Sequence, residues 1–217
     1  MASLSHAQAR PIVIAAWRGI WGRDPTEREV VYSMAVAALE TGYGRAGQFG
    51  QLAARGGYNW GALETRPAED GVCPPGTMAG TDQGSVCFYV YASDEEAARA
   101  FLRSLTQSFP ARASAIVAAM NNGDPIDVAR AMRTPPAYYA GTAATEEGKV
   151  QAYAAAIQNQ LNQITGGGLP PPNTPASGGG SSLLPWLALV GLVGAAAYLR
   201  ENPGAVRKLA RLYHRFD

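Results

Sequence analysis

Charged residues, cysteine and histidine are all scarce in this chain of 217 residues. Lys, Arg, Asp and Glu make up 16% of the chain and apolar residues 47%, so we expect a sizeable hydrophobic core rather than intrinsic disorder. The formal net charge is only +1, so the chain lacks the basic excess with which nucleic-acid-binding proteins neutralise phosphates. We therefore expect one domain of ordinary size with appendages, and no nucleic-acid partner.

The few cysteines and histidines limit the chemistry further. His6 and His214 lie near opposite ends of the sequence, and Cys73 and Cys87 are its two cysteines, so the ligand spacing of a zinc site is missing. We expect no metal ion and no other cofactor. A disulfide between the two cysteines would close a loop of about fifteen residues and contribute roughly 3 kcal/mol in the chain-entropy model. It would indicate an oxidising compartment or an extracellular particle, whereas two free buried thiols are the alternative.

Residues 1–165 predict a mainly helical α+β domain. Apolar periodicity and helix-start signals predict helices over residues 6–21, 25–41, 49–55, 94–108, 110–120, 125–132 and 150–164. For the second helix, Asp24 is the expected N-cap and Pro25 the expected first helical residue. Residues 56–92 are rich in Gly, Pro, Thr and Asp, and the apolar run 86–91 predicts a strand in a small β-lobe.

The C-terminal part of the chain differs in composition from the domain. Residues 166–182 are dominated by Gly, Pro, Ser, Thr and Asn and predict a linker, and residues 183–200 contain an uncharged apolar run that predicts a transmembrane helix. Residues 201–217 predict a basic amphipathic helix on an anionic membrane surface. The basic residues follow the predicted span, so we expect the tail inside and the domain outside. The N-terminal residues lack the pattern of a signal peptide.

Glu40 is the candidate catalytic residue. It closes an apolar helical run that Gly42 and Gly44 terminate. In the last turn the helix dipole disfavours a carboxylate, and burial there would raise the pKa of Glu40, as a proton donor requires. A carboxylic acid in a helix-rich domain with a small β-lobe indicates glycoside hydrolysis, in which one group protonates the leaving oxygen.

The sequence resembles the lysozyme-like peptidoglycan glucosaminidases of the glycoside hydrolase family 73 type, which include phage tail and virion forms. Residues 35–44, Ala-x-x-x-Leu-Glu-Thr-Gly-Tyr-Gly, resemble the catalytic motif of that family. Three further stretches resemble its motifs in the same order, namely Tyr58-Asn59-Trp60-Gly61-Ala62, the strand Phe88-Tyr89-Val90-Tyr91-Ala92-Ser93, and Tyr139-Ala140 with Thr142, Tyr153 and Ile157. Together they cover about residues 25–165.

The resemblance implies a lysozyme-like fold and an enzyme that degrades the bacterial cell wall by cleaving β-1,4 bonds of peptidoglycan glycan strands. It assigns Glu40 as the general acid. It further implies substrate contacts for Tyr43, Asn59, Trp60 and Tyr139, and leaves the second carboxylate open. Asp82 is our first choice for that group, with the alternatives Glu64 and Asp70.

If no second carboxylate faces Glu40, a lytic transglycosylase that uses Glu40 alone is favoured. The domain, the predicted disulfide and the predicted anchor together suggest a membrane-anchored, virion-associated lysin that acts in phage entry. Its partners would be glycan strands, a lipid membrane and other virion proteins, with the catalytic domain on the outer or periplasmic side or in the virion. A bacterial wall-remodelling enzyme and a non-catalytic glycan-binding structural protein are the alternatives.

Overall fold

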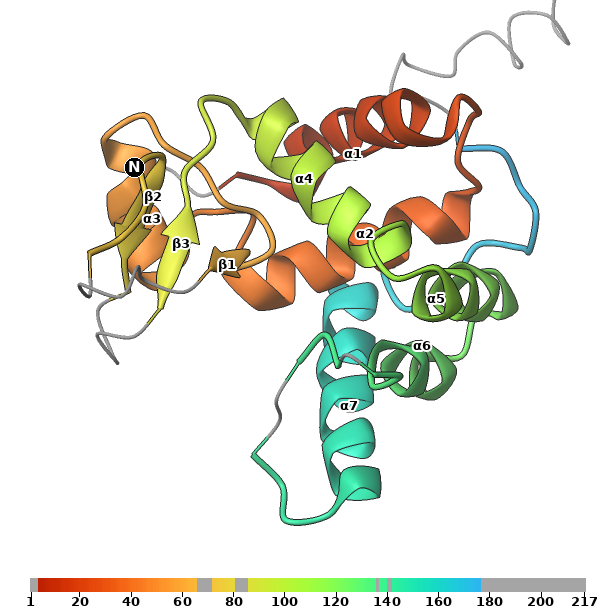
Figure 1. Cartoon of the computed structure of the whole chain (residues 1–217). Coiled ribbons are helices and arrows are strands. Elements are labelled where there is room, and N and C mark those ends of the chain that lie inside the picture. The colour runs from red at the N-terminus through yellow and green to blue at the C-terminus, as the bar shows by residue number, and fades with distance from the viewer. Residues whose placement is uncertain (1–3, 66–71, 81–85, 136, 140–141, 177–217) are drawn as a thin grey trace, which may run out of the picture. The chain divides into compact units, whose positions relative to one another are not determined.

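The computed structural model describes residues 4–65, 72–80, 86–135, 137–139 and 142–176. All of them belong to one compact unit, Met1–Gly178. The described elements are, in order, α1 His6–Trp21, α2 Glu27–Thr41, α3 Gly47–Ala54, β1 Glu64–Thr65, β2 Thr77–Ala79, β3 Cys87–Tyr89, α4 Asp94–Thr106, α5 Pro110–Asn122, α6 Pro125–Met132 and α7 Glu146–Thr165. The unit is therefore a mainly helical α+β domain, as predicted (Figure 1).

Helix α2 lies at the centre of the helical body. It packs against α1, α5 and α7, and its residues 29–37 are buried on all sides rather than along one stripe. A helix with this burial pattern is a core element. It ends at Thr41 because Gly42 adopts a left-handed conformation (φ 55°) and caps the free carbonyls. Glu40 therefore stands at a fixed position at the end of the most buried helix.

The start of α2 differs from the prediction. Thr26, not Asp24, is the N-cap, because its hydroxyl accepts a hydrogen bond from the Glu29 amide while the Glu29 carboxylate accepts one from the Thr26 amide. Asp24 instead forms an ion pair with Arg18. The capping box lies two residues further along the chain than the Asp-Pro pair suggests.

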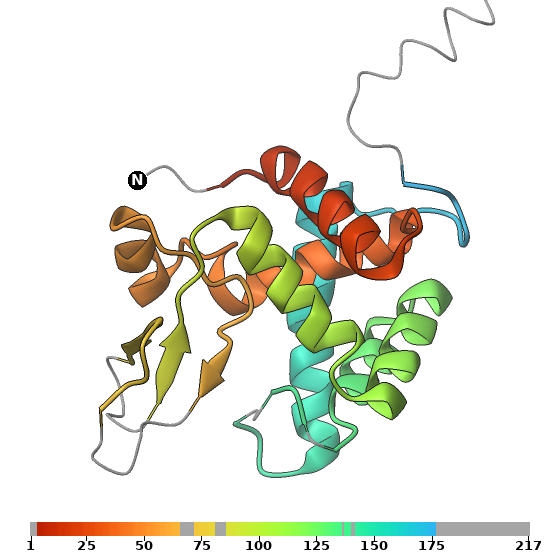
Figure 2. The same cartoon turned by 45° about the horizontal axis from the view of Figure 1, so that its top comes forward.

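The predicted β-lobe is a small antiparallel sheet with the strand order β1-β3-β2. Phe88 at its centre pairs with Glu64 on one side and with Met78 on the other. Cys73 and Cys87 form the predicted disulfide, which ties the segment before β2 to β3. Figures 1 and 2 show the three strands and α3 grouped beside one end of α4.

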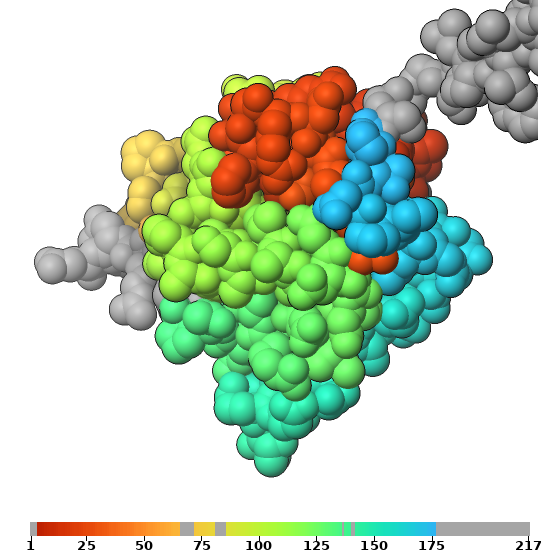
Figure 3. Space-filling view, turned by 90° about the vertical axis from the view of Figure 1, so that its right-hand side faces the viewer, coloured from red at the N-terminus to blue at the C-terminus, as the bar shows by residue number. Residues whose placement is uncertain are grey.

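Part of the predicted linker packs on the domain. The Thr174 carbonyl accepts a hydrogen bond from the Glu27 amide at 2.7 Å, and the Ala176 amide donates to the Pro25 carbonyl at 3.0 Å. These bonds satisfy backbone groups at the start of α2, so residues 166–176 belong to the domain surface (blue in Figure 3). The domain thus extends beyond the predicted boundary at residue 165.

No helix in the part of the chain that the structure describes is long and apolar enough to cross a membrane. The predicted span 183–200 and the predicted amphipathic tail 201–217 lie outside the described residues.

Candidate functional site

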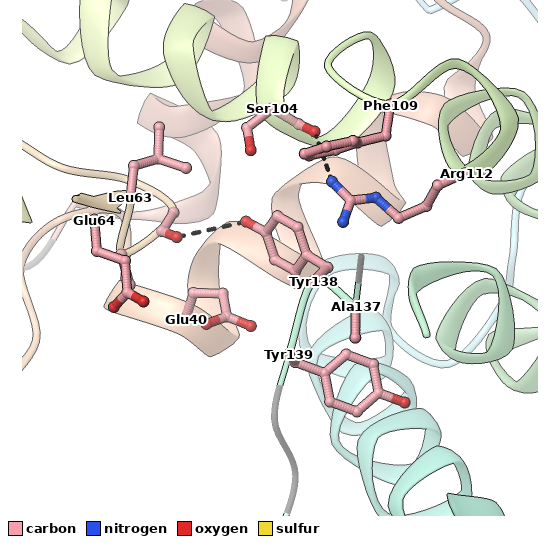
Figure 4. Close-up of a pocket in the computed structure, with 11 residues that line it drawn as sticks. Glu40, Leu63, Glu64, Ser104, Phe109, Arg112, Ala137, Tyr138 and Tyr139 are labelled. Atoms are coloured by element: carbon pink, nitrogen blue, oxygen red, sulfur yellow. Dashed lines mark hydrogen bonds between the residues drawn. The ribbon is translucent and has the colours of Figure 1, made fainter. Parts of the chain in front are cut away.

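A pocket of about 590 Å³ lies where the end of α2 meets the β-lobe, α4, α5 and the segment after α6. It is lined by Glu40, Gly61, Ala62, Leu63, Glu64, Ser104, Phe109, Arg112, Ala137, Tyr138 and Tyr139 (Figure 4). The wall thus combines two carboxylates, one guanidinium and three aromatic rings, which is the mixed lining typical of a ligand pocket.

Glu40 lines this pocket from the last turn of α2. Its carboxylate accepts a hydrogen bond from the Tyr153 hydroxyl on α7. Burial raises the pKa of Glu40, and the hydrogen bond from Tyr153 lowers it by a smaller amount. Glu40 consequently keeps its proton at a higher pH than an exposed glutamate does, as a general acid requires.

Two tyrosines extend the wall around Glu40. The ring of Tyr139 stacks on that of Tyr153 with 3.8 Å between ring centres, and its hydroxyl donates to the Ala129 carbonyl. The predicted residue Tyr139 is therefore brought into the pocket and held there by α6 and α7. Its neighbour Tyr138 also lines the pocket, and its hydroxyl donates to the Gly61 carbonyl at 3.5 Å.

The predicted cleft residue Asn59 has no exposed surface and organises the loop before β1. Its side-chain amide donates to the carbonyls of Leu63 and Tyr89 at 2.9 and 3.0 Å, and its oxygen accepts from the Leu63 amide. These bonds fix the loop that carries Gly61 into the pocket wall. A Cβ at Gly61 would lie 2.5 Å from a ring carbon of Phe101, so glycine is required at this point of the turn.

Trp60 and Tyr43 are buried beneath this loop instead of lining the pocket. Trp60 is 0% exposed and its indole donates to Asp94 at 2.8 Å. Tyr43 is 2% exposed, its hydroxyl is hydrogen-bonded to His6, and its ring packs on Trp60. The structure does not bring these two predicted substrate contacts, or Asn59, to the pocket surface.

Thr41 connects the end of α2 with the same loop. Its hydroxyl donates to the Trp60 carbonyl at 2.7 Å and accepts from the Gly44 amide at 2.8 Å. Thr41, which follows Glu40, is thus hydrogen-bonded to Trp60, which precedes Gly61. We infer that the buried motif residues position Glu40 against the pocket wall.

For the second carboxylate, the structure brings together Glu40 and Glu64. Glu64 is exposed on β1 and lines the same pocket, and Figure 4 shows both carboxylates on one side of it. Asp82, the first choice from the sequence, and Asp70 lie outside the described residues.

The sequence reasoning missed Arg112, Phe109 and Ser104. Arg112 is 3% exposed, and its guanidinium donates to the Ser104 carbonyl at 3.3 Å and lies over the rings of Phe109 and Tyr138. A signal was present, because Arg112 occupies the apolar face of α5 one turn before the buried Ile116. A charged residue on an apolar helix face is a candidate for a functional role.

Within the described ranges, no group of three or more His, Cys, Asp and Glu side chains could hold a metal ion. Comparison of the chain with protein-family models, with curated proteins and with solved structures gives no match. The functional interpretation of this pocket therefore depends on its own geometry and on the sequence motifs that surround it.

Proposed function

We propose that this protein is a peptidoglycan-degrading glycosidase with a lysozyme-like domain, which cleaves β-1,4 bonds of the glycan strand with Glu40 as the general acid. The observation that carries the proposal is the environment of Glu40. This carboxyl group lines a pocket of about 590 Å³, and burial raises its pKa. A protonated carboxylic acid at the wall of an open pocket is what the departure of a sugar oxygen requires.

In the proposed reaction, Glu40 transfers its proton to the glycosidic oxygen as the bond to the anomeric carbon breaks. Tyr153 holds one carboxylate oxygen of Glu40, so the proton is carried by the other oxygen. Glu64 acts as the second group, which activates water or stabilises the positive charge on the sugar ring. Transfer of the glycosyl group to water gives hydrolysis. Attack on the anomeric carbon by a hydroxyl group of the same sugar gives transglycosylation.

The pocket wall fits a carbohydrate chain. Phe109, which is exposed, and the half-buried Tyr138 offer aromatic surfaces to the C–H faces of sugar rings, and the buried Tyr139 lies behind them in the wall. A glycan strand is the substrate class that would use both these aromatic surfaces and the acid Glu40.

The setting we propose is a membrane-anchored, virion-associated lysin that opens the cell wall during phage entry. The disulfide between Cys73 and Cys87 supports an oxidising or extracellular environment. The apolar composition of residues 183–200 supports a membrane anchor, with the catalytic domain on the outer or periplasmic side or in a virion. Other virion proteins are further partners in this setting, and a bacterial wall-remodelling enzyme is the rival.

The test is digestion of purified peptidoglycan by the full chain, followed by mass analysis of the released fragments. Fragments with reducing ends would show hydrolysis, and fragments with anhydro ends would show transglycosylation. Glu64→Gln should abolish hydrolysis but spare transglycosylation, while Glu95→Gln, at an exposed site on α4, serves as the matched control. A folded chain that binds glycan but releases no fragments would overturn the proposal in favour of a non-catalytic glycan-binding protein.

A further inference from the structure

The pocket has chemically different sides. Figure 4 shows Glu40 and Glu64 on one side of Tyr138 and the guanidinium of Arg112 on the other. Among the described residues that line the pocket, Arg112 is the single basic one. A glycan bound along the pocket would therefore meet the reacting acid at one place and a positive charge at another.

Arg112 keeps its charge in this position. Burial lowers its pKa, but an arginine starts so far above neutrality that the guanidinium remains protonated. Burial also raises the pKa of the Tyr138 hydroxyl, and Glu40 raises it further while Arg112 lowers it. Tyr138 thus lies between the acidic side of the pocket and the guanidinium of Arg112 (Figure 4).

The surroundings of Arg112 favour a planar anion. Its guanidinium lies 4.5 Å from the ring centre of Phe109 and 5.7 Å from that of Tyr138, so its plane is held in a narrow range of orientations. One N–H of this buried guanidinium donates to the Ser104 carbonyl. A guanidinium has five N–H donors in a fixed planar arrangement, which matches the two oxygens of a carboxylate with two parallel hydrogen bonds. The hydroxyl and acetamido groups of a neutral amino sugar have no charge with which to make that interaction.

We propose that Arg112 forms a carboxylate subsite, and that the preferred substrate is a glycan in which a sugar next to the cleaved bond bears a carboxylate. This inference rests on the proposed function and narrows its substrate class. In peptidoglycan the carboxylate has two sources, the lactyl ether of a peptide-free muramic sugar and the acidic groups of its peptide stem. The subsite makes the enzyme discriminate between peptidoglycan and chitin-like strands, which carry neither group.

Binding is measured with the full chain carrying Glu40→Gln, so that turnover does not interfere. The probes are neutral chitin oligosaccharides, peptide-free glycan oligomers with free lactyl carboxylates, the same oligomers with the carboxylates amidated, and peptide-bearing oligomers. We expect a carboxylate-bearing oligomer to bind roughly 10- to 100-fold more tightly than its neutral counterpart, the range for hydrogen bonds between charged groups. Preference for the peptide-free or for the peptide-bearing oligomer identifies the source of the carboxylate.

Two variants separate binding from a purely structural role of Arg112. Arg112→Met should remove the preference for carboxylate-bearing oligomers and leave chitin binding unchanged. Arg112→Lys keeps the charge but lacks the paired N–H donors of the guanidinium, so it should retain only part of that preference. Arg103→Met, at an exposed site on α4, is the control for the loss of one arginine. If Arg112→Met does not fold, Arg112→Lys and the amidated oligomers still test whether Arg112 binds a carboxylate.

Equal binding of charged and amidated oligomers would overturn the subsite, as would a full preference in folded Arg112→Met. Failure of the proposed function is a separate outcome. Cleavage without a preference for carboxylates rejects the subsite alone, whereas a preference without cleavage by the wild-type chain rejects the enzyme alone.

Discussion

The raised pKa of Glu40 also affects the stability of the folded protein. Because burial raises its pKa in the folded protein, the native state disfavours the charged form of this side chain more than the unfolded chain does. The contribution of Glu40 to the stability of the native state is therefore largest below the ordinary pKa of glutamate. That part of the stability is lost as the pH rises through the raised pKa.

Glu40→Gln should accordingly raise the melting temperature near neutral pH, because the amide fits the same place, accepts the Tyr153 hydrogen bond and never becomes charged. The gain should disappear at about pH 4, close to the ordinary pKa of glutamate. Thermal melts of both proteins at the two pH values check this. A variant that is less stable than wild type at neutral pH would contradict the assigned shift.

Tyr153 should tune the acid from outside the pocket. Its hydrogen bond lowers the pKa of Glu40, so Tyr153→Phe, which retains the ring that stacks on Tyr139, should raise that pKa further. Activity that depends on protonated Glu40 should then persist to higher pH. The pH profile of kcat/KM measures this, and an alkaline limb that moves to lower pH would show that Tyr153 acts differently.

At the scale of single residues, the sequence pointed to the candidates that a local pattern distinguishes. Glu40 is recognisable because helix periodicity and the following glycines place it at a helix end. Asn59 and Trp60 were recognised as a motif, but a turn pattern does not determine which side chains face the core. Arg112 and Tyr138 were missed because only the packing of α5 and of the segment after α6 brings them to the pocket that Glu40 lines.

At the scale of elements, the start of α2 shows how a helix boundary depends on tertiary partners. Glu29 is 1% exposed and serves both the capping box and an ion pair with Arg23 at 2.6 Å. Burial raises the pKa of Glu29, but hydrogen bonds from Arg23, Thr26 and Asn121 lower it overall. The sequence signal for a helix start at Asp24 and Pro25 was equally strong. The hydrogen bonds and the ion pair of the buried Glu29 explain why the later cap at Thr26 is used.

Thr26→Ala should therefore destabilise the protein by about 1 kcal/mol, the usual loss for an N-cap residue. Asp24→Ala removes only the exposed contact with Arg18 and should change the free energy of unfolding by less than about 0.5 kcal/mol. Denaturant unfolding of the two variants checks the assignment. A larger loss for Asp24→Ala than for Thr26→Ala would restore the boundary predicted from the sequence.

At the scale of the whole molecule, composition and periodicity were sufficient for the mainly helical α+β class, whereas the domain boundary was not predictable. Residues 166–176 have the composition of a linker. They are nevertheless hydrogen-bonded to backbone groups of Pro25 and Glu27 at the start of α2, and Arg28 adds a hydrogen bond to the Pro170 carbonyl at 2.8 Å. A segment without charges or an apolar pattern gives no sequence signal for such contacts.

A chain that ends at residue 165 should thus be less stable than one that ends at residue 178. Three hydrogen bonds to α2 and its N-terminal flank are lost, at about 1 kcal/mol each, so we expect a difference of roughly 2–3 kcal/mol. Denaturant unfolding of the two truncated chains measures it. Equal stability would show that residues 166–176 behave as the linker that their composition suggests.

The most direct test of the central claim is the rate at which the full chain and its Glu40→Gln variant release fragments from purified peptidoglycan. Binding of both proteins to the glycan is measured in parallel, so that a loss of rate can be assigned to chemistry. We predict that Glu40→Gln binds like wild type and loses roughly 10²- to 10⁴-fold in rate, the contribution of a general acid. Equal rates for the two proteins, or no release by either while both bind glycan, would contradict the assignment of Glu40.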